Sequence, residues 1–163
     1  MIQLRLARPE EYAAVGELTV GAYLADGALT ADDPYLRLLR DAAGRAAGAE
    51  LWVAVDEEEA LVGTVTWCPP GSPYRELGGH AEGEFRALAV APAARGRGVG
   101  RLLVEHCLRR AQETGSDSLV ISTAQWMTSA HRLYRRLGFL PAPERDWWPR
   151  PDVHLLAFVR PMP

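Results

Sequence analysis

The sequence predicts one mixed α/β domain over residues 1–163, in which helices pack on a sheet. Short apolar segments with strand-like patterns recur along the chain, separated by segments with a helical spacing of apolar residues. Two strand segments, at 50–55 and 61–67, flank a short acidic turn and predict an antiparallel hairpin. A length of 163 residues is enough for one domain with a substantial core.

The first half of the chain alternates strand and helix signals. Ile2, Leu4 and Leu6 alternate with polar residues, which predicts a half-buried strand. Pro9 and the two acids after it are typical of the first turn of a helix. The elements expected here are a strand at 2–6, a helix from 9 towards 23, a loop at 25–33, a helix at 34–47 and the hairpin strands at 50–55 and 61–67.

The second half begins with a long loop at 69–83, rich in proline and glycine, and loops of that length are often functional. The helix expected at 98–113 has a clear apolar face that includes Cys107, which we expect to be a buried small hydrophobic residue. The other expected elements are strands at 84–90, 118–123, 139–143 and 153–160, a helix at 128–137 and a turn region at 144–152.

Composition and charge narrow the class of protein. The net charge of -3 and a pI near 5.8 argue against a nucleic-acid binder, which usually carries a basic surplus. Cys68 and Cys107 cannot make a disulfide framework or a zinc site, and the four histidines show no metal spacing, so we expect no metal and a reducing cytoplasm. No segment reads as a signal peptide or approaches the ~20 apolar residues of a membrane span.

The stretch from Arg95 to Gly100, Arg-Gly-Arg-Gly-Val-Gly, lies where a predicted strand is followed by a predicted helix. The first backbone N–H groups of a helix have no partner within it, and the helix dipole places partial positive charge there. Glycine lets the backbone approach a ligand closely, and neighbouring arginines add full charges. The sequence therefore predicts a pyrophosphate site at this helix start.

Two common phosphate motifs do not fit this stretch. A Walker A loop needs Gly-Lys-Ser/Thr, and the chain has no such triplet. A dinucleotide fingerprint needs Gly-x-Gly-x-x-Gly, whereas Gly96, Gly98 and Gly100 are each two residues apart. The antiparallel hairpin before the motif is also unlike a dinucleotide-binding fold.

A third pattern does fit. Arg95, Gly98 and Gly100 match Arg/Gln-x-x-Gly-x-Gly/Ala between a strand and a helix, which resembles the acyl-CoA signature of the GNAT N-acetyltransferase superfamily. Ala130-x-x-Leu133-Tyr134-x-x-Leu137-Gly138-Phe139 resembles a later helix and strand of that family, and the element order agrees over nearly the whole chain. The resemblance implies a GNAT fold: one mixed, mostly antiparallel sheet flanked by helices, with a splayed central strand pair.

The resemblance also implies a cofactor and its site. The co-substrate is acetyl-CoA, whose pyrophosphate is held by backbone N–H groups at the helix start and whose pantetheine arm pairs with the end of the preceding strand. The residues expected to bind it are Leu88, Ala89, Val90, Arg95, Gly96, Arg97, Gly98, Val99, Gly100 and Arg101.

The reaction implied is direct transfer of an acetyl group from a thioester to a primary amine. Tyr134 matches the tyrosine that protonates the leaving thiolate in the family. Glu84 is the candidate general base, acting through water, and Glu82 is its rival. A backbone N–H of Leu88 or Ala89 would stabilise the oxyanion. No activated cysteine is evident, which disfavours an acyl-enzyme.

The family pattern leaves several features open. Met127 stands where the family often has an asparagine, so Thr128 or Ser129 would have to replace that contact. Trp126, Trp147 and Trp148 are candidates for the wall of an acceptor pocket. The acceptor is a small-molecule or peptide amine, and acids at 26–33 and in the 69–83 loop would suit a cationic one. Homodimers are common among similar proteins. The alternative function is a non-catalytic acyl-CoA-binding module, and a nicotinamide-dependent oxidoreductase is a third class.

Overall fold

The computed structural model describes residues 1–27 and 29–163 and contains an eight-stranded sheet. Its order is β1-β2-β3-β4-β5-β8-β6, with β7 also beside β8. All neighbours are antiparallel except β4 and β5, which confirms a mixed, mostly antiparallel sheet. The strands are β1 (Gln3–Leu6), β2 (Glu50–Val55), β3 (Leu61–Cys68), β4 (Glu82–Val90), β5 (Ser118–Ala124), β6 (Leu140–Pro141), β7 (Trp147–Arg150) and β8 (Val153–Pro161).

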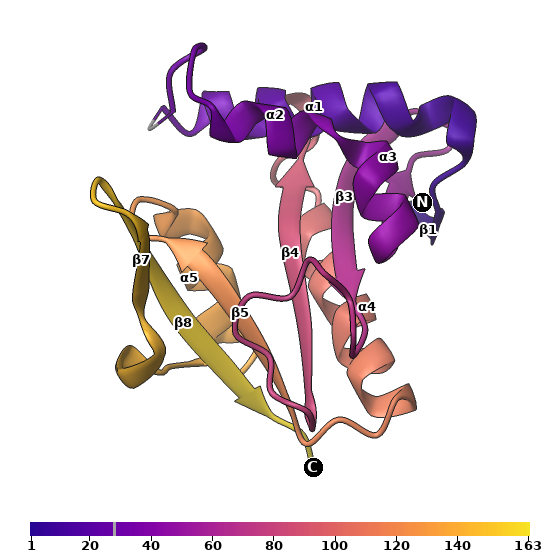
Figure 1. Ribbon diagram of the computed structural model, residues 1–163. Helices are drawn as coiled ribbons and strands as arrows, with labels where there is room; N and C mark the ends of the chain where they lie inside the picture. Colours follow the sequence, from indigo (N-terminus) through magenta and orange to yellow (C-terminus); the bar gives the residue numbers. More distant parts are fainter. Residues whose placement is uncertain (28) are drawn as a thin grey trace.

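Helices flank the sheet. They are α1 (Tyr12–Ala25), α2 (Tyr35–Arg40), α3 (Ala42–Gly48), α4 (Val99–Glu113) and α5 (Thr128–Arg136). Both α1 and α4 contact β3 and β4, and Figure 1 shows α1 with α2 across the upper ends of these strands and α4 behind them. None of the described helices is long and apolar enough to cross a membrane.

The central strands β4 and β5 pair only at their first residues. The parallel register runs from Glu82 opposite Ser118 to Glu84 opposite Val120 and then stops. Figure 1 shows the two strands diverging above this point. Ala87 has a positive φ of 54°, and the pairing of β4 with β3 shifts beside it, as in a β-bulge that bends a strand. The upper part of β4 is therefore free on the β5 side.

The largest hydrophobic cluster of the described chain lies between the sheet and the helices α4 and α5, and two smaller ones involve α1, α2 and α3. Its largest fully buried side chains include Trp67, Phe85, Phe139 and Phe158. On α4 the predicted apolar face is buried, and Cys107 is a fully buried free thiol, which confirms that prediction. The sheet and α4 thus form a rigid support for the carboxyl end of β4.

Two elements differ from the sequence predictions. The helix expected at 34–47 is broken at Asp41, whose backbone leaves the helical region and whose Oδ1 accepts the Gly44 N–H at 3.0 Å, so that it caps a new helix. The region expected as a turn at 144–152 contains β7, which pairs with β8. The sequence did not predict this strand because it contains Pro149, and proline is tolerated only in edge strands such as this one.

Candidate active site

The predicted pyrophosphate site forms the amino end of α4. Gly96 and Gly98 have positive φ values of 81° and 77°, which glycine adopts without strain. In the described chain, Leu102 is the first residue of this helix whose backbone N–H has an acceptor, the Gly98 carbonyl at 3.1 Å. The N–H groups of the three preceding residues, Val99, Gly100 and Arg101, have no acceptor there and carry the positive end of the helix dipole.

The three arginines around this helix start have different surroundings. Arg95 donates from Nη2 to the Ala22 carbonyl at 3.3 Å and lies 3.3 Å from Asp26, so it ties the site to the carboxyl end of α1. Arg101 pairs with Glu105 one turn along α4, at 2.7 Å. Arg97 is exposed. Arg95 thus has a structural contact in addition to the binding role that the sequence predicts for it.

The segment Leu88–Val90 forms the open edge of β4. Ala89 and Val90 pair with Thr64 and Gly63 of β3, but in the described chain no residue of β5 pairs with this segment. An extended edge with free backbone groups can accept an amide-containing ligand as an added strand. The predicted pantetheine segment is therefore an open strand edge, and the chain runs directly from it to the start of α4.

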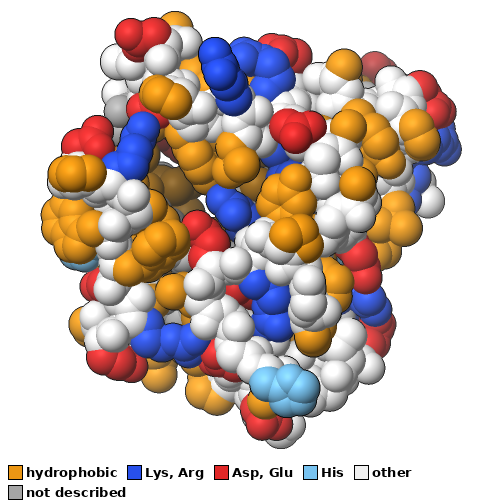
Figure 2. All heavy atoms as spheres, viewed as in Figure 1, with side chains coloured by type: hydrophobic (Ala, Val, Ile, Leu, Met, Phe, Trp, Pro, Cys, Tyr) orange, Lys and Arg blue, Asp and Glu red, His pale blue; other side chains and the backbone are white. Residues whose placement is uncertain are grey.

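A cavity of about 370 Å³ occupies the space between the diverging strands. Figure 2 shows a hollow on this face with apolar side chains inside it and charged groups at its rim. Its wall is mainly aromatic and aliphatic, with contributions from Tyr23, Leu29, Tyr35, Leu38, Leu88, Trp126 and Leu155. Met127 also lines it, whereas Trp147 and Trp148 do not: Trp147 donates to Ser122 Oγ, and Trp148 stacks on His154.

Tyr134 of α5 is buried and lines this cavity. Its ring packs against Phe85, Phe139 and Phe158, which fix its position. Within residues 1–27 and 29–163 its hydroxyl makes no hydrogen bond to another group of the chain. Burial raises the pKa of this phenol, so it carries its proton at neutral pH. The structure thus provides a protonated hydroxyl on the cavity wall.

Glu84 lies elsewhere. Its side chain is fully buried and does not line the cavity. Its carboxylate accepts three successive backbone N–H groups, from Glu76 at 2.9 Å, Leu77 at 3.2 Å and Gly78 at 2.7 Å. Glu84 therefore holds the 69–81 loop against β4, and its oxygens are already occupied.

Glu82 is also engaged by other groups. It pairs with Arg145 at 2.8 Å and accepts hydrogen bonds from Ser118 Oγ and the Gly79 N–H. The hydrogen bonds from Arg145 lower the pKa of Glu82 to about 2. A carboxylate with so low a pKa is a weak base, and Glu82 does not line the cavity.

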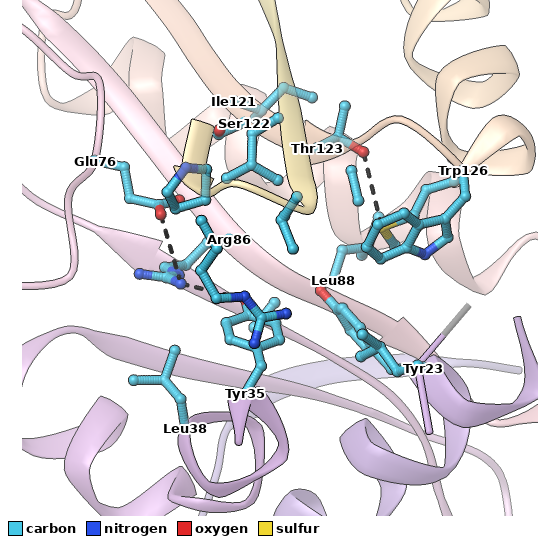
Figure 3. Close-up of a pocket in the computed structure, with 18 of the residues that line it drawn as sticks. Tyr23, Tyr35, Leu38, Glu76, Arg86, Leu88, Ile121, Ser122, Thr123 and Trp126 are labelled. Carbon is cyan, nitrogen blue, oxygen red and sulfur yellow. Dashed lines mark hydrogen bonds and ion pairs between the residues drawn. The ribbon is translucent and has the colours of Figure 1, made fainter. Parts of the chain in front are cut away.

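Three charged residues that the sequence did not single out line the cavity: Glu76, Arg86 and Arg150. Arg86 donates to the Tyr74 carbonyl at 3.2 Å and to the Tyr35 hydroxyl at 3.3 Å, and lies 3.9 Å from Glu76. Figure 3 shows Glu76, Arg86 and Tyr35 grouped in this way. Burial raises the pKa of Glu76, and Arg86 opposes this. The one available signal was the position of Glu76 in a long loop predicted to be functional.

The comparisons with known proteins agree with this geometry. The chain is 32% identical over 120 residues to human N-acetyltransferase 8B, which covers 71% of this chain and 51% of that protein. A GNAT-family acetyltransferase structure from Staphylococcus aureus Mu50 matches all of both chains with a TM-score of 0.75 and 16% identity. The Salmonella typhimurium protein yncA, with its cofactor acetyl-CoA, matches 99% of this chain and 94% of its own with a TM-score of 0.69 and 22% identity.

The chain spans about half the length of that human relative. The sequence profile described as the acetyltransferase (GNAT) family matches residues 15–139, from α1 to the start of the segment after α5. This range contains the open edge of β4, the amino end of α4 and Tyr134. The chain therefore belongs to the acetyltransferase (GNAT) family.

Proposed function

We propose that this chain is an acetyl-CoA-dependent N-acetyltransferase that moves an acetyl group directly to a primary amine. The observation that carries the proposal is the end of the β4–β5 pairing at Glu84 and Val120. Beyond this point the edge of β4 that faces β5 is open, and a cavity lies between the two strands. The Tyr134 side chain lines this cavity. The start of α4 follows β4 in the chain. Such an arrangement can hold an extended thioester with its reactive end inside the protein.

The residues present fit the co-substrate. The unpaired N–H groups at the start of α4 suit a pyrophosphate, and the left-handed Gly96 and Gly98 leave the backbone uncovered. The open edge at Leu88–Val90 suits the amides of a pantetheine arm. Acetyl-CoA supplies the activated acetyl group when bound, and the chain supplies its orientation.

The chemistry then needs three groups from the chain. A backbone N–H of Leu88 or Ala89 donates to the carbonyl oxygen of the thioester as negative charge develops there. The amine nitrogen forms a bond to the carbonyl carbon, the carbon–sulfur bond breaks, and Tyr134 gives its proton to the sulfur. The third group is an acceptor for the proton that the amine loses.

Direct transfer is supported by the positions of the two cysteines. Burial raises the pKa of Cys68 to about 12 and raises that of Cys107 as well. Both thiols are therefore protonated and buried, and neither lines the cavity. An acyl-enzyme would need a thiolate beside the thioester.

We assign Glu84 a positioning role in place of the base role that the sequence favoured. A general base has to reach the amine at about 2.6–3.2 Å or through one water. Glu84 instead fixes the backbone of Glu76, which does face the cavity. Glu84 thus acts on the site through the 69–81 loop.

Two measurements test the function. A thermal-shift comparison should show stabilisation by acetyl-CoA and none by NAD, because a ligand that binds only the folded state raises its melting temperature. Release of free thiol from acetyl-CoA should then depend on added amine across a broad panel. Binding of acetyl-CoA without turnover of any amine would favour a non-catalytic acyl-CoA-binding module, and stabilisation by NAD would favour the oxidoreductase class.

A further inference from the structure

The charged groups that line the cavity are unevenly balanced. Among the described lining residues there is one carboxylate, Glu76, and there are two guanidinium groups, Arg86 and Arg150. Arg150 already lies 3.3 Å from both carboxylate oxygens of Asp33, which is outside the cavity wall. The charges left facing the cavity are therefore one carboxylate, that of Glu76, and one guanidinium group, that of Arg86.

This remaining pair is incomplete. Arg86 and Glu76 approach only to 3.9 Å, which is beyond hydrogen-bond distance, although their side chains are just 13% and 18% exposed. The hydrogen bonds that Arg86 makes go to two neutral oxygens, of Tyr74 and Tyr35. A largely buried charge is costly unless it is paired and hydrogen-bonded. A ligand with one positive and one negative group would give both Glu76 and Arg86 a partner of opposite charge.

We propose that the amine acceptor is a zwitterion of the amino-acid class with an apolar side chain, its ammonium bound by Glu76 and its carboxylate by Arg86. The inference rests on the proposed acetyl transfer and names the substrate class of that site. The amino and carboxylate groups of an amino acid are close neighbours, as are Glu76 and Arg86. The side chain would lie among aromatic and aliphatic residues such as Tyr23, Leu38 and Trp126.

The positions of the two residues relative to the transfer site agree with this binding mode. Arg86 is separated from Leu88 only by Ala87, the residue of the bulge with positive φ. Glu76 is set beside Arg86 by the Glu84 carboxylate, which accepts its backbone N–H at 2.9 Å. Glu76 would take a proton from the bound ammonium, and the neutral amine would then attack the thioester carbonyl. Burial makes Glu76 a stronger base than an exposed carboxylate.

The same charges disfavour a purely cationic acceptor, which the acids at 26–33 and in the 69–83 loop led us to expect from the sequence; of these acids Glu76 lines the cavity. Asp26 is paired with Arg95 and Asp33 with Arg150, while Asp32 accepts a hydrogen bond from Thr30. None of the three lines the cavity, and two arginines do. The second ammonium group of a diamine would face the positively charged Arg86 and would remain unpaired.

The proposal is tested by binding to the enzyme saturated with CoA, measured by calorimetry. Leucine, methionine and phenylalanine are each compared with their carboxamide, which keeps the shape and the ammonium but removes the negative charge. We expect at least one acid to bind ~10-fold or more tightly than its amide, as for a charge-assisted hydrogen bond. Equal binding of every acid and its amide, or preference for a diamine, would overturn the proposal.

Variants locate the effect. Arg86→Gln should remove the difference between acid and amide, whereas Arg109→Gln, a change at an exposed residue of α4, should leave that difference as in the wild type. Glu76→Gln should lower kcat for every amine. A difference that survives in Arg86→Gln would place the carboxylate elsewhere and overturn the assignment. Failure of acetyl-CoA to bind at all would count against the proposed function itself, whereas acetylation without an acid–amide difference would count only against the zwitterion.

Discussion

Glu84 and Glu76 are eight residues apart and have opposite surroundings. Glu84 is fully buried, and its oxygens are filled by three backbone N–H groups. Glu76 faces the cavity and has only a loose contact with Arg86. In the function proposed above, Glu84 therefore organises the loop, and the loop supplies Glu76 to meet the substrate.

A second residue-scale feature is the hydroxyl of Tyr134. We expect Tyr134→Phe to lower kcat about 100-fold, because general acid catalysis typically contributes 10²–10⁴-fold. Acetyl-CoA affinity and stability should change little, since phenylalanine keeps the ring contacts with Phe85, Phe139 and Phe158. Steady-state kinetics and calorimetry with acetyl-CoA are the measurements. An unchanged kcat would mean that the thiolate receives its proton from another group.

At the scale of elements, the backbone conformation at the amino end of α4 depends on its glycines more than on its arginines. A Cβ added at Gly98 would meet no described atom within 4 Å, so the space directly around it is open. Its φ of 77° nonetheless strains any other residue by roughly 1–2 kcal/mol.

We expect Gly98→Asp to weaken acetyl-CoA binding at least about 100-fold, because its charge would lie where a pyrophosphate is held. Gly98→Ala is the matched control for backbone strain, and it should weaken binding by only a few fold. Aspartate is one of the few non-glycine residues that adopt a left-handed backbone at modest cost, so the binding loss should occur without unfolding. Calorimetry measures the affinities, and wild-type affinity in Gly98→Asp would show that the pyrophosphate binds elsewhere.

The packing of α1 on α2 depends on one glycine and not on another. A Cβ at Gly16 would lie 2.2 Å from the Arg40 carbonyl oxygen, whereas one at Gly21 would meet nothing within 4 Å. We expect Gly16→Ala to reduce the free energy of unfolding by about 1–3 kcal/mol. Gly21→Ala, on the exposed side of the same helix, should increase it by about 0.5–1 kcal/mol. Urea unfolding of both variants checks this, and equal effects would contradict the close contact.

At the scale of the whole molecule, the two halves of the sheet are joined below the cavity. There Glu82 of β4 binds Arg145, Ser118 of β5 and the Gly79 N–H, and Arg145 also donates to the Leu77 carbonyl. This cluster connects both central strands, the 69–81 loop and the segment before β7. It lies at Glu82 and Ser118, where the β4–β5 pairing begins, so it holds the two strands together at the end of the paired segment away from the cavity.

The cluster should make stability depend on acid. The pKa of Glu82 is about 2 in the folded protein, below the value of about 4.3 expected in an unfolded chain. The folded form therefore binds fewer protons, and this stabilisation is complete above about pH 5 and is lost as the pH falls towards 2.

We expect Glu82→Gln to reduce the free energy of unfolding at pH 7 by roughly 1–2 kcal/mol after allowance for solvent screening. The difference from the wild type should shrink as the pH falls to about 3. Glu58→Gln at the exposed hairpin turn is the control and should have little effect. Urea unfolding at both pH values measures the difference, and one that persists at low pH would show that the Glu82 charge is not responsible.

Much of this molecule could be predicted from local patterns. The hairpin of β2 and β3, the apolar face of α4 and the glycine motif depend on residues that are neighbours in sequence. The structure confirms the hairpin and the apolar face, and it has Gly96 and Gly98 with positive φ directly before α4. Two elements were missed because one local preference opposed another. The helix break at Asp41 could have been recognised only from the preference of aspartate for a helix N-cap, and β7 was missed because it contains Pro149, which disfavours a strand.

The sequence by itself determined the class of fold and the family, because strand and helix periods and a phosphate motif are written along consecutive residues. Only the tertiary structure decided which acid faces the cavity, because burial and hydrogen bonding depend on elements far apart in the chain. Glu84 is enclosed by the backbone of a loop, Glu82 by Arg145, and Glu76 is left beside Arg86. The side chains available to an acceptor follow from that enclosure.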